Sequence, residues 1–160
     1  MRIGVISDTH IPRHAKQIPA QVKEMFRGVD LILHAGDINT QSVLRELNAI
    51  APTEAVAGNT DSAAAVQILG ERKLLELGGF RVGLTHGHLG RGNTTPERAL
   101  SCFPQADVVV FGHSHQPFNQ LVKGKLLLNP GSPTAKRQEK HYSVAILTLG
   151  DEATAEILHF

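Results

Sequence analysis

The sequence predicts an α/β fold in which two β-sheets pack face to face and helices cover their outer surfaces. Two observations carry this prediction. In residues 2–57, β-rich runs alternate with runs whose apolar residues have helical spacing. From residue 72 onward, most of the short apolar runs come in pairs that flank a tight turn. A chain of 160 residues can bury a core of its own, so we expect a single domain over residues 1–160.

The first half of the chain has the order β-α-β-α-β. Gly28 ends the first helical run, and Thr40 is the expected cap of the second helix. The expected elements are a strand over 2–7, a helix over 18–27, a strand over 30–35, a helix over 41–49 and a strand over 54–57. Because strands joined through helices run parallel, this order predicts a parallel sheet covered by helices.

The second half of the chain favours β-hairpins. Gly78-Gly79 and Lys123-Gly124 stand between paired strand-like runs, as two-residue turns do. The expected pairs are 72–77 with 80–85, 118–122 with 125–128, and 142–149 with 154–159. A helix is expected over about 96–103, after Thr95 and with Pro96 at its first position. A buried type of strand is expected over 107–111.

Composition excludes several classes of protein. With 16 Lys and Arg against 15 Asp and Glu, the net charge is +1 and no long block of one sign occurs, so nucleic-acid binding gains no support. The single cysteine, Cys102, suits a reducing compartment. The N-terminal apolar run is too short for a signal peptide or a membrane span. We therefore expect a cytoplasmic protein without a membrane partner.

The histidine content is high: the chain has nine histidines, one tyrosine and no tryptophan. Histidine is the commonest metal ligand in proteins, so this content suggests a chemical role. Polar residues of metal-ligand type follow several strand-like runs, and Asp37, after the run 31–35, is the central one. The residues are Asp8, His10, Asp37, Asn59, His86, His88, His113 and His115. Where the strands lie side by side, these ends bring carboxylate, imidazole and amide groups together. We therefore predict a two-metal site in which Asp37 shares its two oxygens between the cations.

The residue types limit the choice of metal. Mixed Asp, His and Asn ligands without cysteine favour Mn²⁺, Fe or Ni²⁺, allow Zn²⁺, and argue against a structural zinc site. The pairs Asp8 with His10 and His113 with His115 are two residues apart, so they hold one ion together if extended or serve adjacent ions on a bent loop. His34, inside an apolar run, is expected to be a core histidine or to support a ligand.

The complete motif set resembles that of the calcineurin-like metallophosphoesterases. The matching segments are Asp8-x-His10, Gly36-Asp37, Gly58-Asn59, His86 and Gly112-His113-x-His115, in this order. The short length and Asn129-Pro130-Gly131-Ser132 resemble the small phosphodiesterase branch of this family, of the YfcE type and related to Vps29. The resemblance implies a four-layer αββα sandwich of two mixed sheets flanked by helices.

The same resemblance implies the ligand sets and the reaction. Asp8, His10 and His115 would hold the first metal, and Asp37 would bridge the two. Asn59, His86 and His113 would hold the second metal. The implied reaction is hydrolysis of a phosphodiester bond of a small substrate by a hydroxide activated between two divalent cations, with Mn²⁺ the expected metal.

One departure concerns the acid that protonates the leaving group. Many larger members of the family have a histidine after the asparagine of Gly-Asn, where this chain has Thr60. His88, on the same loop as His86, is the proposed substitute, and a supporting contact to a ligand is the alternative. Arg13 and Arg91 are candidates for binding the substrate phosphate, and Ser132 for contacting a phosphate or the metal loops.

Two further interpretations stay open. The alternative function is a non-catalytic protein-interaction scaffold of the Vps29 type, although all seven metal-ligand positions hold ligand-competent side chains. The strand edges of the C-terminal hairpins and the apolar end Ile157 to Phe160 favour association into a homo-oligomer.

Overall fold

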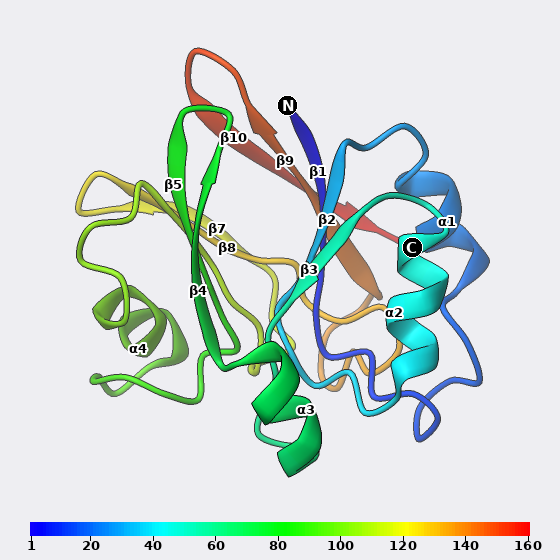
Figure 1. Ribbon diagram of the computed structural model, residues 1–160. Coiled ribbons are helices and arrows are strands. Elements are labelled where there is room, and N and C mark those ends of the chain that lie inside the picture. Colours follow the sequence, from blue (N-terminus) through cyan, green and yellow to red (C-terminus); the bar gives the residue numbers. More distant parts are fainter.

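The structure, a computed structural model, describes residues 1–160 and consists of two five-stranded sheets with helices on their outer faces (Figure 1). The first sheet has the order β10-β9-β1-β2-β3 and the second the order β4-β5-β6-β8-β7. In the first sheet, β1 (Arg2–Ile6), β2 (Leu31–His34) and β3 (Thr53–Ala55) are parallel, as predicted. None of the helices is long and apolar enough to cross a lipid bilayer.

The three predicted hairpins form, but they do not all belong to the second sheet. Strands β9 (Ser143–Leu149) and β10 (Ala153–His159) join the first sheet, where β9 runs antiparallel to β1. The second sheet contains β4 (Arg72–Leu77), β5 (Phe80–Thr85), β6 (Val108–Val110), β7 (Phe118–Val122) and β8 (Lys125–Asn129). The last hairpin pairs with the free edge of β1 and makes the first sheet mixed. The second sheet is mixed because β5, β6 and β8 run parallel while β4 and β7 run antiparallel to their neighbours.

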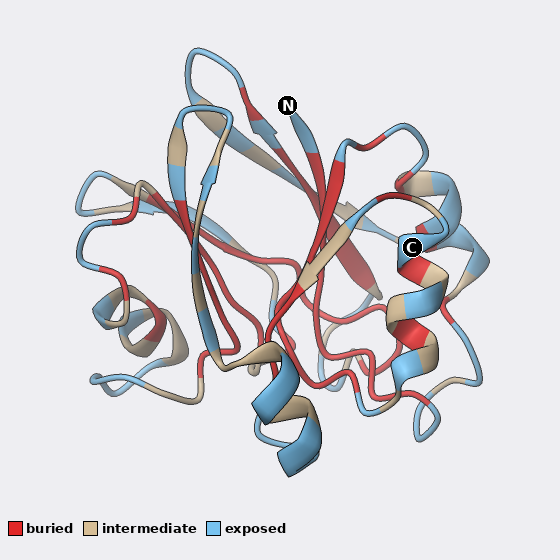
Figure 2. Cartoon of the chain, in the orientation of Figure 1, coloured by how far each residue is buried: buried red, intermediate tan, exposed pale blue.

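Side-chain alternation along the strands produces three hydrophobic clusters. Ile3 and Val5 of β1 point between the sheets, where they join Val82, Leu84 and Leu128. Ile6 and Ile32 point the other way, toward helices α1 (Ala20–Met25) and α2 (Gln41–Asn48). Val109 and Leu127 pack against α4 (Thr95–Ser101) on the far side of the second sheet. The molecule therefore has four layers, and Figure 2 shows the buried strands between them.

The helices differ from the predictions in their number and in their bounds. Helix α1 covers Ala20–Met25 rather than 18–27, with Pro19 at its N-cap. A helix that the sequence reading missed, α3 (Ala63–Leu69), begins after Ser62, whose side chain accepts a hydrogen bond from the amide of Ala65. All of its residues but Gln67 are apolar and none is buried, so no division into an apolar and a polar face marks it as a helix. Helix α4 begins at Thr95 rather than Pro96, because Thr94 and Glu97 form a capping box. The cap at Thr40 is as predicted.

Candidate metal centre

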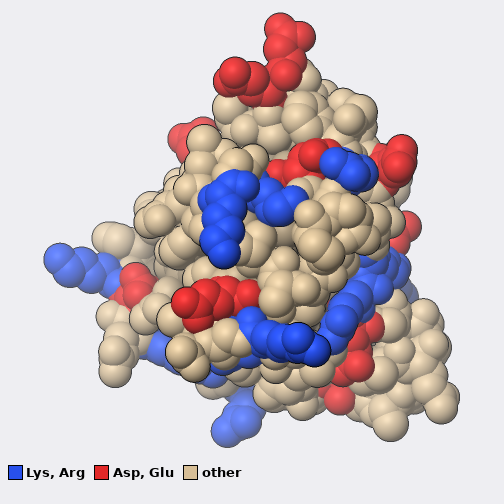
Figure 3. Space-filling model, turned by 90° about the vertical axis from the view of Figure 1, so that its left-hand side faces the viewer, with Lys and Arg blue, Asp and Glu red and all other residues tan.

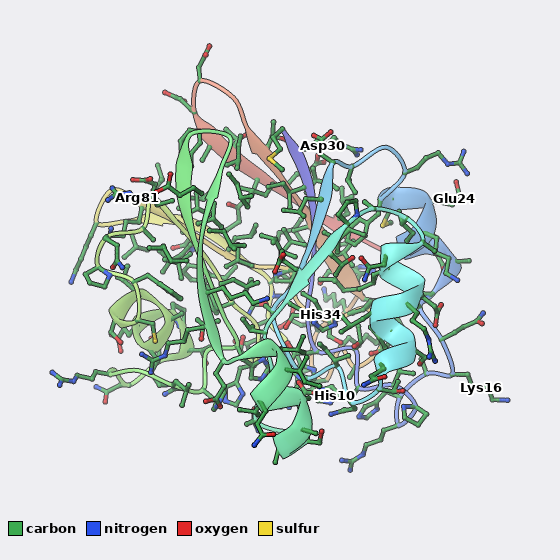
Figure 4. The ribbon with its side chains drawn as sticks, viewed as in Figure 1. His10, Lys16, Glu24, Asp30, His34 and Arg81 are labelled. Atoms are coloured by element: carbon green, nitrogen blue, oxygen red, sulfur yellow. The ribbon has the colours of Figure 1, made fainter.

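Polar residues gather at one edge of the two sheets, at the carboxyl ends of β1, β2, β3, β5 and β6 (lower edge in Figure 1). Parallel strands deliver their following loops to the same edge of a sheet. Two sheets packed face to face therefore bring loops from both halves of the chain together. Figure 2 shows that much of the backbone at this edge is buried, and Figure 4 labels His10 there. The edge thus has the enclosed, polar character of a binding site.

The innermost groups are two carboxylates and three imidazoles. Asp8 Oδ1 lies 3.3 Å from His115 Nε2, 3.8 Å from His10 Nε2 and 3.9 Å from His86 Nε2. Asp37 Oδ2 lies 3.2 Å from His86 Nε2 and 3.5 Å from His10 Nε2. Two groups of three residues have all their donor atoms within 4.8 Å of one another. The first group is Asp8, His10 and His115, and the second is Asp8, Asp37 and His86.

Two of these atoms are buried without any hydrogen-bond partner, Asp8 Oδ1 and His86 Nε2. The 3.2 Å contact of His86 Nε2 with Asp37 lacks the alignment of a hydrogen bond. An unpaired polar atom in the interior costs about 1–3 kcal/mol, so such atoms need an explanation. A divalent cation explains both, because carboxylate oxygen and imidazole nitrogen are its ligands. The donor set therefore fits metal ions.

Hydrogen bonds on the far side of each ring orient the histidines. His86 Nδ1 donates to the carbonyl of Ala35 (2.7 Å), and His115 Nδ1 donates to the carbonyl of Ala135. His10 Nδ1 lies 3.1 Å from Asn39 Oδ1. When Nδ1 carries the proton, the lone pair of Nε2 is free and faces the centre. Two backbone carbonyls and the side chain of Asn39 thus present three histidines in the tautomer that binds a metal.

The loops that carry these residues are bent. Asp8, His10, Asp37, His113 and His115 have φ values of 55°, 43°, 57°, 69° and 61°. Residues other than glycine rarely adopt positive φ, and such positions cluster at functional sites. The pairs Asp8 with His10 and His113 with His115 therefore follow the bent-loop alternative rather than the extended one.

Two glycines let the loops approach the carboxylates. A Cβ on Gly58 would lie 2.2 Å from Asp37 Oδ1, and a Cβ on Gly112 would lie 1.8 Å from Ser7 Oγ and 2.6 Å from Asp8 Oδ2. Asp8 Oδ2 accepts hydrogen bonds from the Ser7 hydroxyl (2.7 Å) and the amide of His113 (3.0 Å). One oxygen of Asp8 is thus fixed by the protein, and the other faces the centre.

Charge coupling among these groups sets their protonation. Burial raises the pKa of Asp37, but its contacts with His86 and the amide of Thr60 outweigh burial and lower it. Burial likewise opposes ionisation of Asp8, yet contact with His115 and the charge of His86 lower its pKa. Burial lowers the pKa of His86, but the contacts with Asp37 and Asp8 raise it by more, so the net shift of this pKa is upward. Both carboxylates are therefore ionised, as metal binding requires.

Asn59 and His113 lie on the outer side of the centre. Asn59 is exposed, and its Oδ1 is 3.1 Å from His113 Nδ1. The ring of His113 lies 5.1 Å from that of His86, measured between centroids. The two side chains are thus next to the inner groups, and they contact each other rather than Asp37.

His88 lies beside the centre, with its ring centroid 5.4 Å from that of His86. Its Nε2 is 3.3 Å from Glu71 Oε1, and its Nδ1 is buried without a hydrogen-bond partner. Burial, followed by the charge of His86, lowers the pKa of His88. The sequence did not predict this contact of Glu71, because the two residues are 17 positions apart and meet only in the folded chain.

Asp61 is a second residue whose role was missed. Its Oδ1 accepts hydrogen bonds from the amides of Ile38 (2.9 Å) and Asn39 (2.7 Å), and its Oδ2 accepts from the amide of Gly58 (2.8 Å). The Asp37 loop and the Asn59 loop are therefore held together by one carboxylate. Its place in Gly58-Asn59-Thr60-Asp61 was the only available signal.

The remaining candidates support the loops or face solvent. Ser132 donates to the carbonyl of Asp8 (2.8 Å), so it contacts the metal loops rather than an open phosphate site. His34 is fully buried and bonds to Thr9 and the amide of Gly36, as expected for a core histidine. Arg13 and Arg91 are exposed, and their side chains form no ion pair within the chain.

Comparisons with known proteins agree on one family. The model of the calcineurin-like phosphoesterase superfamily domain matches residues 1–152. A probable metallophosphoesterase of Methanothermobacter thermautotrophicus is 45% identical over 159 residues, covering 99% of this chain and 92% of its own.

Solved structures share the fold over nearly the whole chain. Vps29 from Entamoeba histolytica in complex with Zn²⁺ has a TM-score of 0.80 and 25% identity, and the match covers 99% of each chain. An archaeal phosphodiesterase has a TM-score of 0.75 and 25% identity, covering 99% of this chain and all of its own. The two-sheet arrangement of this chain is therefore that of both an enzyme and Vps29.

Proposed function

This chain belongs to the calcineurin-like phosphoesterase superfamily, and from that premise we propose that it is a metal-dependent phosphodiesterase acting on a small substrate. The observation that carries the proposal is the buried, unpaired Asp8 Oδ1, which faces the Nε2 atoms of three histidines. A protein without a metal would gain stability by pairing or removing this atom. The unpaired Asp8 Oδ1 therefore supports the proposal that this protein binds a metal.

Two divalent cations are proposed, with Asp37 between them. Asp8, His10 and His115 would hold one ion, and His86, Asn59 and His113 the other. Asp37 Oδ2, within 3.5 Å of both His10 and His86, supports the bridging role. The hydrogen bond between Asn59 and His113 would open when both bind a cation.

Nitrogen and oxygen donors favour Mn²⁺, with Ni²⁺, Fe or Zn²⁺ as alternatives. Such a pair of cations supplies activated water and neutralises charge on the phosphoryl oxygens. Asp37 and Asn59 would therefore contribute to catalysis by positioning the two cations next to the phosphoryl oxygens of the substrate.

His88 is proposed to donate a hydrogen bond to the leaving oxygen. Its Nδ1 is buried and unpaired, while its Nε2–H donates to Glu71, so Nδ1 can donate only when both ring nitrogens are protonated. Burial and the charge of His86 lower the pKa of His88 and oppose this form, so the proposed role requires the negative charge of a bound phosphate to favour it. The side chain of Thr60 cannot take this role as an acid near neutral pH, and its amide instead donates to Asp37 Oδ1 (2.9 Å). Without a histidine at residue 60, the site favours diesters over monoesters.

The proposed substrate is small. On the face shown in Figure 3, basic and acidic side chains are interspersed, so this face has none of the broad basic surface that binds nucleic acid. The similarity to an archaeal phosphodiesterase supports the same choice of reaction. Self-association through strand edges remains a proposal for the oligomeric state.

A second candidate function follows from the similarity to Vps29, namely a protein-interaction scaffold of that type. Hydrogen bonds that fix the tautomers of His86 and His115 support metal binding in either case, since the Vps29 structure also contains Zn²⁺. Turnover of a diester is what separates the enzyme from the scaffold.

The test is hydrolysis of bis(p-nitrophenyl) phosphate by metal-stripped protein, titrated separately with Mn²⁺, Ni²⁺ and Zn²⁺. We expect turnover to return with metal, to exceed that of p-nitrophenyl phosphate, and to vanish in Asp37→Ala. Asp151→Ala, in the exposed turn between β9 and β10, is the matched control and should keep full activity. Binding of two ions without turnover of any diester would contradict the proposal and favour the scaffold.

A further inference from the structure

A groove of about 340 Å³ lies between α2 and α3. Figure 1 shows these two helices near the edge of the sheets that carries the candidate metal centre. The volume of the groove is in the range of small-molecule sites in proteins. Apolar side chains from both helices form much of its lining, namely Leu44 of α2 and Ala64, Ala65, Ile68 and Leu69 of α3. The groove therefore offers an apolar wall to a ligand.

Of the α3 side chains in the lining, only Leu69 packs against a hydrophobic cluster. None of the residues of α3 is buried, and Ile68 is 73% exposed. Exposed apolar surface that contributes little to the core is typical of a binding site. The exposed apolar side chains of α3 are thus available to a ligand that binds in the groove.

The groove borders the loops that carry two of the metal-site residues, because Asn39 follows Asp37 and Asp61 follows Asn59, each by two residues. Asn39 lines the groove, and its Oδ1 is 3.1 Å from Nδ1 of His10. The side-chain Nδ2 of Asn39 donates to the backbone carbonyl of Thr60 (3.0 Å), the residue after Asn59. Asp61 also lines the groove and fixes the loop that carries Asp37. An ester group that leaves the centre past Asn39 would therefore meet the groove.

The lining also contains a free guanidinium group. Arg45 is exposed, and its side chain forms no hydrogen bond or ion pair within the chain. Guanidinium groups stack on aromatic faces, whereas an alkyl chain gives them no comparable partner. The combination of an apolar wall and a free arginine favours an aromatic ring over an aliphatic chain.

We propose that the groove between α2 and α3 binds an aromatic ring carried on one ester group of the substrate. This inference rests on the proposed function, because it assigns the groove to a phosphoester held at the metal centre. It defines the substrate as an aryl or heteroaryl ester of phosphate. The apolar wall and Arg45 would select such esters over alkyl esters of the same charge.

Direct binding tests the inference without relying on turnover. Calorimetry on protein loaded with Zn²⁺ should give a Kd for phenyl phosphate about tenfold lower than that for methyl phosphate, since the two differ only in the buried ring. Ile68→Glu should abolish this preference, and Arg45→Gln should reduce it severalfold. Leu121→Glu is the matched control, because Leu121 is 74% exposed on β7, in the other sheet, and it should keep the preference.

Each outcome separates the groove from the proposed function. Equal affinity for the two esters in an active enzyme would overturn the inference and leave the function intact. A preserved preference without turnover of any diester would support the groove and contradict the function. In amide NMR spectra, phenyl phosphate should shift the signals of Ala64, Ala65 and Ile68. Shifts that follow protein concentration instead would show that a second copy covers the groove, which also overturns the inference.

Discussion

The two edges of the sheets reverse the chain in different ways. At the edge with the hairpin turns, positive φ values occur at Gly78, Gly79, Lys123 and Gly124, where turns of this kind need them. At the opposite edge, positive φ values occur at Asp8, His10, Asp37, His113 and His115, and these residues are mostly buried. Most positive φ values in the turns therefore occur at glycine, which adopts them without strain. In the metal centre they occur at aspartate and histidine, whose backbone is strained there.

The edges also differ in what surrounds the backbone. A Cβ added to Gly79 or Gly124 would meet nothing within 4 Å, whereas one added to Gly112 would overlap Ser7. Buried polar atoms without partners, such as Asp8 Oδ1, occur at the site edge. This pattern is expected where structure is retained for chemistry rather than stability. Three predictions test whether the difference has that origin.

The largest expected effect is that of Asp8→Asn. The substitution removes the charge that faces His10, His86 and His115, so metal-dependent hydrolysis should fall by about 10³-fold, because metal chemistry contributes several kcal/mol. The free energy of unfolding of the metal-free protein should also fall, because the lowered pKa of Asp8 means that its ionised form stabilises the folded protein at neutral pH. Urea unfolding and steady-state kinetics measure the two effects. Metal-dependent activity that is unchanged in folded Asp8→Asn would show that Asp8 has only a structural role.

Much of this difference between edges could be predicted from the sequence. Glycine pairs between apolar runs marked the turns, and polar residues directly after apolar runs marked the site edge, because both signals are local. The contacts of Glu71 with His88 and of Asp61 with the Asp37 loop are not local, since the partners are 17 and 22–23 residues apart and meet only after the strands pair. Helix α3 was missed for a related reason, because it buries nothing.

The second prediction compares glycines at the two edges. Gly112→Ala should lower the free energy of unfolding by about 3 kcal/mol, because the new methyl group overlaps Ser7 Oγ and Asp8 Oδ2. Gly79→Ala, at φ 84° in open space, should cost only about 1 kcal/mol, from backbone strain alone. Urea denaturation of metal-free protein gives both values. Equal costs at the two positions would mean that the site edge is no more constrained than the turns.

The smallest expected effect concerns His34, which lies beneath the centre at the end of β2. Burial lowers the pKa of His34 to about 4, so between pH 6.5 and 4 the unfolded chain binds a proton there that the native protein does not. The free energy of unfolding must therefore fall as the pH falls through this range, by about 2 kcal/mol between pH 7 and pH 5 from this residue. Urea denaturation of metal-free protein should show this loss in wild type and in His141→Gln, whose histidine is exposed, but not in His34→Gln. If His34→Gln loses as much stability as wild type on acidification, the buried imidazole is not the source, and the pH sensitivity of the site edge must come from the carboxylates instead.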